Sequence, residues 1–186
     1  MAVAQHEILP GKALIINLNK ILLGNKNSLQ ELNWMLTAKR MSIVLIYLTE
    51  QNMASAWDLI GRENLLHPDV LVTESGSEVR WSPDYSIDQE WERYNSEQPF
   101  LNSGNVSSIE LALRYLRDKL RLKKRDIVLC GNNEILPLFE AGYQGVLMRD
   151  KHKLNKYPLP NWVYKAAKPY AGGILEGLKH YNFGIK

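Results

Sequence analysis

Short apolar runs alternate with amphipathic segments along the first half of the chain. Three runs, at residues 12–18, 42–48 and 70–73, are rich in leucine and β-branched residues and are too short for buried helices. Between them, segments 28–39 and 52–61 repeat their apolar positions every three or four residues, as amphipathic helices do. Ser28 is the expected N-cap of the first helix, and Gly61 is the expected end of the second. This alternation predicts a parallel sheet with helices on its faces.

The second half continues the alternation. Ser107 and Glu110 have the spacing of a capping box and open a segment whose apolar positions form one stripe from Ile109 to Leu120. The later elements are expected near residues 127–130 (strand), 134–141 (helix), 145–148 (strand) and 170–182 (helix). The pattern therefore predicts a single three-layer α/β domain over residues 1–186.

Residues 81–106 differ from the rest of the chain because they are acidic, aromatic and interrupted by prolines. We interpret this segment as an insertion after the third strand, with one short helix near 87–95. It carries more aromatic side chains than a solvated loop needs. Some must cover the sheet, and others could form a protein interface, because aromatic residues supply contact area at low entropic cost. The candidate interface residues are Trp81, Tyr85, Trp91, Tyr94 and Phe100.

Composition excludes several classes of protein. A hydrophobic content of 45% and a charged content of 23% are typical of globular domains. No apolar run approaches the ~18–20 residues of a membrane helix, and the N-terminus lacks the pattern of a secretory signal. The net charge of +3 does not by itself indicate nucleic-acid binding. The basic clusters at 123–125 and 151–156 could bind phosphate groups, an acidic protein surface or nucleic acid, but solvated loops are the default expectation. We expect a soluble, cytoplasmic protein.

Cysteine and histidine usage argues against a metal site. The single cysteine, Cys130, excludes an internal disulfide and a cysteine-rich zinc site, and we expect it to be a buried packing residue. The four histidines have no ligand spacing. We therefore expect neither a metal nor a cofactor.

In open parallel sheets, ligands bind beyond the carboxyl ends of the strands. Polar residues follow three of the predicted strands there: Asn17 and Asn19 after the first, Thr49 after the second and Asn132 after the fourth. These positions are the candidate functional site.

Several segments, in order, resemble the haloacid dehalogenase superfamily, and most closely its sucrose-phosphate phosphatase branch and the phosphatase-like domain of sucrose-phosphate synthases. The segments that carry the resemblance are Val72-Thr-Glu-Ser-Gly-Ser-Glu-Val, Asp88-Gln-Glu-Trp, Ser108-Ile-Glu-Leu-Ala-Leu-Arg-Tyr-Leu, Ile127-Val-Leu-Cys-Gly-Asn-Asn-Glu and Gly173-Ile-Leu-Glu-Gly-Leu-Lys-His-Tyr. The resemblance implies a Rossmann-like α/β/α core, with residues 81–106 as a truncated form of the family's sugar-binding cap.

The same resemblance implies that the catalytic positions have changed. The family's first motif is Asp-x-Asp-Gly-Thr, and Asn17 and Asn19 stand where it has the nucleophile and the acid/base. Ile109 replaces a phosphate-binding lysine, and Asn132 and Leu136 replace magnesium carboxylates. A carboxamide is a poor nucleophile and does not exchange a proton near neutral pH, while magnesium depends on carboxylate ligands.

We therefore expect a catalytically inactive phosphatase-like protein that acts as a protein-binding, scaffolding or regulatory subunit. The alternative is a non-hydrolysing sensor of a sugar phosphate or another anion. Such a sensor would use Thr49, which matches the family's phosphate-binding Ser/Thr, together with Asn19 and Lys20. A third hypothesis is a residual sugar-phosphate phosphatase.

Overall fold

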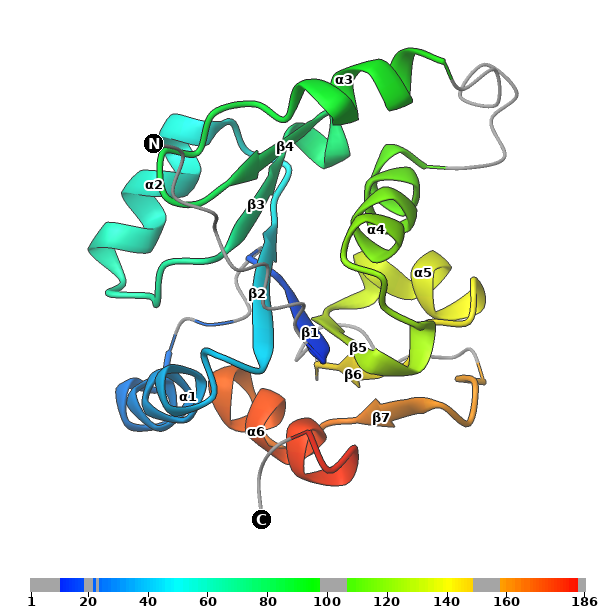
Figure 1. Cartoon of the computed structure of the whole chain (residues 1–186). Coiled ribbons are helices and arrows are strands. Elements are labelled where there is room, and N and C mark those ends of the chain that lie inside the picture. The colour runs from blue at the N-terminus through cyan, green and yellow to red at the C-terminus, as the bar shows by residue number, and fades with distance from the viewer. Residues whose placement is uncertain (1–10, 19–21, 23, 98–106, 149–157, 184–186) are drawn as a thin grey trace.

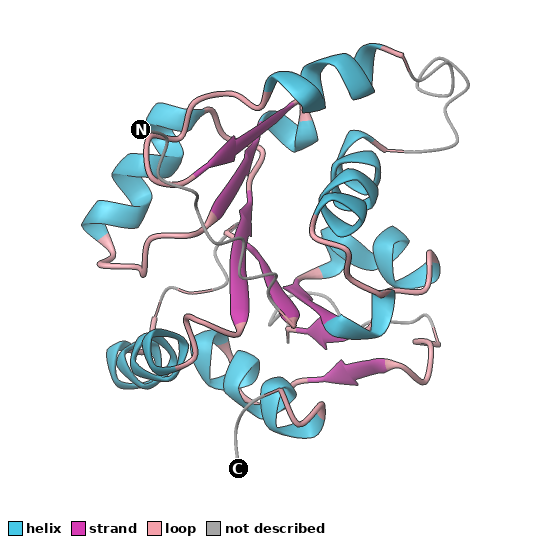
Figure 2. Ribbon diagram, in the orientation of Figure 1, coloured by secondary structure: helices cyan, strands magenta, loops and turns pink. Residues whose placement is uncertain are grey.

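The computed structural model describes residues 11–18, 22, 24–97, 107–148 and 158–183. Its centre is a seven-stranded sheet of order β4-β3-β2-β1-β5-β6-β7 (Figures 1 and 2). The strands are β1 (Lys12–Asn17), β2 (Ile43–Leu48), β3 (Val70–Thr73), β4 (Glu78–Trp81), β5 (Ile127–Gly131), β6 (Gly145–Leu147) and β7 (Val163–Lys165). Only β4 is antiparallel to its neighbour, and the other neighbouring pairs are parallel. The sheet confirms the predicted α/β class.

Helices cover both faces of the sheet (Figure 1). They are α1 (Lys26–Ala38), α2 (Met53–Arg62), α3 (Gln89–Ser96), α4 (Ser108–Lys119), α5 (Leu136–Glu140) and α6 (Tyr170–His180). None of the helices in the described ranges is long and apolar enough to cross a membrane.

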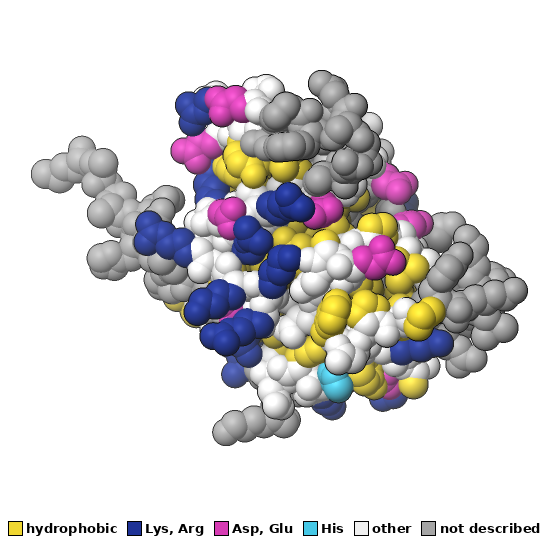
Figure 3. Space-filling model, turned by 90° about the vertical axis from the view of Figure 1, so that its right-hand side faces the viewer, with side chains coloured by type: hydrophobic (Ala, Val, Ile, Leu, Met, Phe, Trp, Pro, Cys, Tyr) yellow, Lys and Arg dark blue, Asp and Glu magenta, His cyan; other side chains and the backbone are white. Residues whose placement is uncertain are grey.

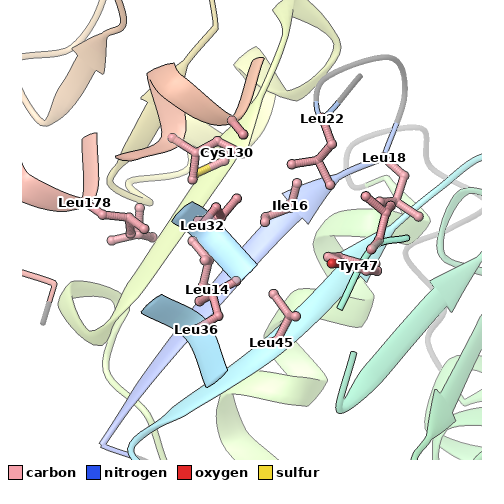
Figure 4. Packing of buried hydrophobic residues seen from close by; sticks show 14 of the residues in the cluster. Leu14, Ile16, Leu18, Leu22, Leu32, Leu36, Leu45, Tyr47, Cys130 and Leu178 are labelled. Carbon is pink, nitrogen blue, oxygen red and sulfur yellow. The ribbon is translucent and has the colours of Figure 1, made fainter. Parts of the chain in front are cut away.

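The two faces of β1 divide the core between the helix layers, because successive side chains of a strand point to opposite faces. Leu14 and Ile16 pack with Leu32 of α1 and Leu178 of α6, on the face that α1, α2 and α6 cover (Figure 4). On the other face, Ala13 and Ile15 belong to a second cluster with residues of α3, α4 and α5. The result is the predicted three-layer Rossmann-like arrangement.

Several element boundaries differ from the prediction. Helix α1 begins at Lys26, and its N-cap is Asn25, whose side chain accepts a hydrogen bond from the Ser28 backbone N at 3.1 Å. Helix α2 continues one residue past Gly61. The helix expected at 134–141 is a 3₁₀ turn, Asn133–Ile135, followed by α5. The short strands β4 and β7 were not predicted.

The described part of the insertion is built into the domain around Asp88. Oδ1 of this side chain caps α3, and Oδ2 accepts hydrogen bonds from Trp81 Nε1 at 2.7 Å, Tyr115 OH at 2.8 Å and Lys119 Nζ at 2.8 Å. Lys119 also pairs with Glu90 at 2.9 Å. These contacts join the insertion to α4, and we call this group the Asp88 hub.

The structure removes two of the five aromatic residues of the insertion from the candidate interface, and for the others the interface stays a prediction. Trp91 is fully buried and contacts the rings of Tyr94 and Tyr115, and Tyr85 is buried with its hydroxyl bonded to the Pro68 carbonyl. Tyr85 and Trp91 therefore have no surface to offer a partner. Trp81 and Tyr94 are half-buried against the second core cluster, and Phe100 lies outside the described residues.

Candidate functional site

The candidate site lies where the strand order reverses. Strand β1 has β2 on one side and β5 on the other, and the connections from these two neighbours lead away in opposite directions across the sheet. Asn17 is the last residue of β1, Thr49 follows β2, and Asn132 follows β5. The three residues that the sequence places at strand ends therefore sit at the switch point where ligands bind in open α/β sheets.

Asn17 is the central residue of this crevice. It is 5% exposed, and its Nδ2 donates a hydrogen bond to Oε2 of Glu134 at 3.4 Å. Glu134 lies on the 3₁₀ turn after β5, where its backbone N donates to Oδ1 of Asn132 at 3.0 Å. Asn132 thus shapes the turn that brings the Glu134 carboxylate towards Asn17.

Thr49 is 4% exposed and is held by the backbone on both sides. Its N donates to the Val72 carbonyl at 3.0 Å, and its carbonyl accepts from Ser75 N at 3.2 Å. Its hydroxyl accepts a hydrogen bond from Gln51 N at 3.1 Å. The hydroxyl keeps its own proton to donate, so Thr49 remains a group that can bind an oxygen ligand.

The turn after β3 fixes the N-terminus of α4 beside the crevice. Glu74 and Ser75 have φ values of 50° and 56°, and Gly76 has a φ of 97°. A Cβ at Gly76 would come within 2.6 Å of the Ser108 and Ile109 backbone, so only glycine fits this approach. Ile109 packs against the second core cluster, so the first turn of α4 presents an apolar side chain where the family resemblance implied a lysine.

The described residues do not fit a magnesium ion. Leu136 packs against the second core cluster, and Oδ1 of Asn132 is already bonded to Glu134 N. Within the part of the chain that the structure describes, no group of three His, Cys, Asp or Glu side chains could hold a metal. One carboxylate beside two amides is a weak donor set for a hard divalent cation.

Sequence reasoning missed Glu134. Comparison with the family directed attention to the positions that normally carry its catalytic and magnesium-binding groups, and Glu134 is not one of these positions. Its separation of two residues from Asn132, directly after a buried strand, was the available signal. Asn19 and Lys20 lie outside the described residues.

Cys130 lies near the end of β5 but is not a reactive group. It is 1% exposed, and burial raises the pKa of its thiol well above the usual range. A thiol that stays protonated is a poor nucleophile. The structure therefore places Cys130 in the core, as predicted.

Comparison with solved structures supports the fold. A sucrose-phosphatase from Synechocystis sp. PCC6803, solved with sucrose and phosphate, superposes with a TM-score of 0.78 at 21% identity, covering 93% of this chain and 98% of that one. A haloacid dehalogenase-like hydrolase from Bacillus subtilis gives a TM-score of 0.73 at 14% identity, covering 92% and 88% of the two chains. One from Bacteroides thetaiotaomicron gives 0.60 at 9% identity, covering 94% and 99%.

These likenesses show the fold alone, because all three identities are low. No curated protein is similar enough in sequence to match the chain. The model of one family, described as sucrose-6F-phosphate phosphohydrolase, matches residues 10–99 and 104–182. Because this model matches most of the chain, and because the fold is that of the haloacid dehalogenase superfamily, the chain belongs to the sucrose-6F-phosphate phosphohydrolase family.

Proposed function

We propose that this protein is a non-hydrolysing member of its family that acts as a protein-binding or regulatory subunit in the cytoplasm. The observation that carries the proposal is Asn17, a buried carboxamide at the end of the central strand. This is the position from which a phosphatase of this family would attack phosphorus. An amide has no charge and a weakly nucleophilic oxygen, so the step that forms a phosphoryl-enzyme has no attacking group there.

The neighbours of Asn17 support the same proposal. The Asn17 amide donates a hydrogen bond to the Glu134 carboxylate, so the buried amide has a polar partner within the protein. A cluster of catalytic carboxylates would instead need magnesium to offset their mutual repulsion. The crevice is therefore built to be stable in the empty state.

The anion-sensor alternative receives less support from the described residues. Thr49 can still donate a hydrogen bond, but the carboxylate of Glu134 adds negative charge to the same crevice. A phosphate group would be repelled by that charge. The other two residues of this alternative, Asn19 and Lys20, lie outside the described ranges.

The direct test is phosphate release from sucrose 6-phosphate in the presence of magnesium. We expect no release above the buffer rate. Magnesium-dependent release that is lost in Thr49→Ala would overturn the proposal. Calorimetry with sugar phosphates addresses the sensor hypothesis, and isolation of bound proteins from the native cell tests the role as a subunit: if nothing co-purifies, the proposed role as a subunit fails.

A further inference from the structure

The edge of the sheet opposite the crevice is rich in cations. Lys12 pairs in register with Ile43, and Ala13 pairs with Ile127, so the segments that precede β1, β2 and β5 are neighbours. The end of α6 joins them, because Lys12 Nζ donates to the Asn182 carbonyl at 3.2 Å. We define the basic edge as the side chains that these segments bring together: Lys12, Lys39, Lys123, Arg125 and Lys179.

The acidic groups near this edge are already engaged. Asp69 pairs with Arg40 at 2.8 Å, and Oδ2 of Asp126 accepts a hydrogen bond from the Lys123 backbone at 3.0 Å. Among the described residues, no side chain of the basic edge takes part in an ion pair. Figure 3 views the molecule from the α4 and α5 side and shows Lys and Arg side chains gathered in its left and central parts. The left of that view is the side that faces the reader in Figure 1.

Two large apolar side chains close to Lys39 in the sequence are exposed at the surface. Trp34 on α1 is 75% exposed, and Met41, in the turn that leads to β2, is 71% exposed. An exposed tryptophan supplies contact area with little loss of conformational entropy, which is why tryptophan is enriched at the centres of protein interfaces.

We propose that the basic edge, together with Trp34 and Met41, is the docking surface for an acidic segment of a partner protein. Glu and Asp side chains of that segment would pair with the cations, and an apolar side chain would pack on Trp34 and Met41. The apolar part of the surface favours a protein over a nucleic acid, because the phosphate backbone is bound by charged and polar groups and not by a methionine side chain. The inference rests on the proposed protein-binding function and specifies the surface and the chemistry of the partner.

The test is a titration with a fluorescein-labelled peptide of glutamates interrupted by leucines, followed by fluorescence anisotropy. The triple variant Lys39→Glu, Lys123→Glu, Arg125→Glu should lose about tenfold in affinity. The matched control applies the same change of charge at exposed lysines far from the basic edge, whose side chains take part in no described hydrogen bond or ion pair. It combines Lys26→Glu, Lys165→Glu and Lys168→Glu and should stay within about twofold of the wild type.

A second arm separates the apolar contact from the charges. Trp34→Ala should weaken the leucine-containing peptide several-fold and leave a peptide of glutamates alone unchanged. Equal losses in the triple variant and its control would overturn the inference, because net charge alone would then explain binding. Tighter binding of double-stranded DNA than of the peptide would overturn it as well. Phosphate release by the wild type would defeat the proposed inactivity and would leave this titration unaffected, so the two failures are distinguishable.

Discussion

The Asp88 hub predicts that Asp88→Asn strongly destabilises the fold. Asp88 is 9% exposed, and one oxygen of its carboxylate, Oδ2, accepts hydrogen bonds from Trp81, Tyr115 and Lys119. Asparagine can still cap α3, but its amide group would face these donors without accepting from them. Losing a hydrogen bond to a charged partner costs ~1.5–3 kcal/mol, and breaking a buried ion pair costs ~3–5 kcal/mol.

The expected loss lies between these ranges. The Lys119 side chain is 33% exposed and keeps Glu90 as a partner, so solvent and the second carboxylate stabilise the ammonium group that remains. We expect the free energy of unfolding to fall by about 3 kcal/mol. Urea denaturation followed by circular dichroism measures this change.

The matched control is Glu92→Gln, an exposed position on the same helix, which should change stability by less than ~0.5 kcal/mol. A double-mutant cycle with Lys119→Met should show a coupling of at least ~1 kcal/mol between the two residues. A loss below ~1 kcal/mol in Asp88→Asn, or additivity in the cycle, would refute the reasoning that the insertion is fixed to α4 through this carboxylate.

Four further predictions concern the pKa of Asp88 and the residues Gly76, Cys130 and Glu134. Burial opposes ionisation of Asp88, but hydrogen bonds from Lys119, Tyr115 and Trp81 outweigh it and lower the pKa of this carboxyl in the folded state. The stability that the carboxylate contributes is therefore present above the ordinary pKa of 3.8 and is lost as pH falls through the lower folded pKa. Urea denaturation curves of the wild type and Asp88→Asn should converge in acid. Gly76→Ala should lower the melting temperature by several degrees in a thermal scan, because its Cβ meets the Ser108 backbone at a positive φ. Cys130 should react with a chromogenic thiol reagent only in denaturant, because its thiol is buried and protonated in the folded protein; the absorbance of the released chromophore measures the reaction. Glu134→Gln removes the carboxylate bonded to Asn17 and should strengthen binding of inorganic phosphate several-fold in ³¹P NMR titrations; unchanged binding would show that this carboxylate does not control access of anions.

The layers of the fold could be predicted because buried strands and amphipathic helices differ in period. The limits of this reasoning are visible in α1. Its apolar positions begin at Leu29, but the polar residues Lys26 and Asn27 already belong to the helix, so periodicity marks the first buried turn and not the cap. Strands β4 and β7 were missed because they lie at the two edges of the sheet and are only partly buried, so neither forms a continuous apolar run. Strands β3 and β6 are as short but fully buried, and their apolar runs were recognised.

The insertion shows why composition did not identify a surface. An aromatic side chain packs equally well on its own domain or on a partner, and sequence does not distinguish the two. Trp91 is buried against Tyr115 of α4, and Asp88, three residues earlier, is bonded to Lys119, which lies 31 residues from it along the chain. Contacts of that separation depend on the fold and leave no local pattern. Trp34 was overlooked although it lies off the stripe of α1 that Leu32, Met35 and Leu36 bury.

The site at the switch point could be predicted in part: the positions of its residues follow from the strands, but its charge depends on contacts that the sequence pattern does not show. Strand ends can be located from sequence, and Asn17, Thr49 and Asn132 were placed correctly at those ends. The charge of the crevice could not be obtained in this way, because Glu134 reaches Asn17 only through the 3₁₀ turn that Asn132 caps. Asn17 stands at the end of the strand, where the family resemblance implies an aspartate, and the carboxylate of Glu134 lies instead on an exposed turn. In that position the carboxylate accepts a hydrogen bond from Asn17 and gives the buried amide a polar partner. This arrangement supports the proposal that residue 17 does not attack phosphorus.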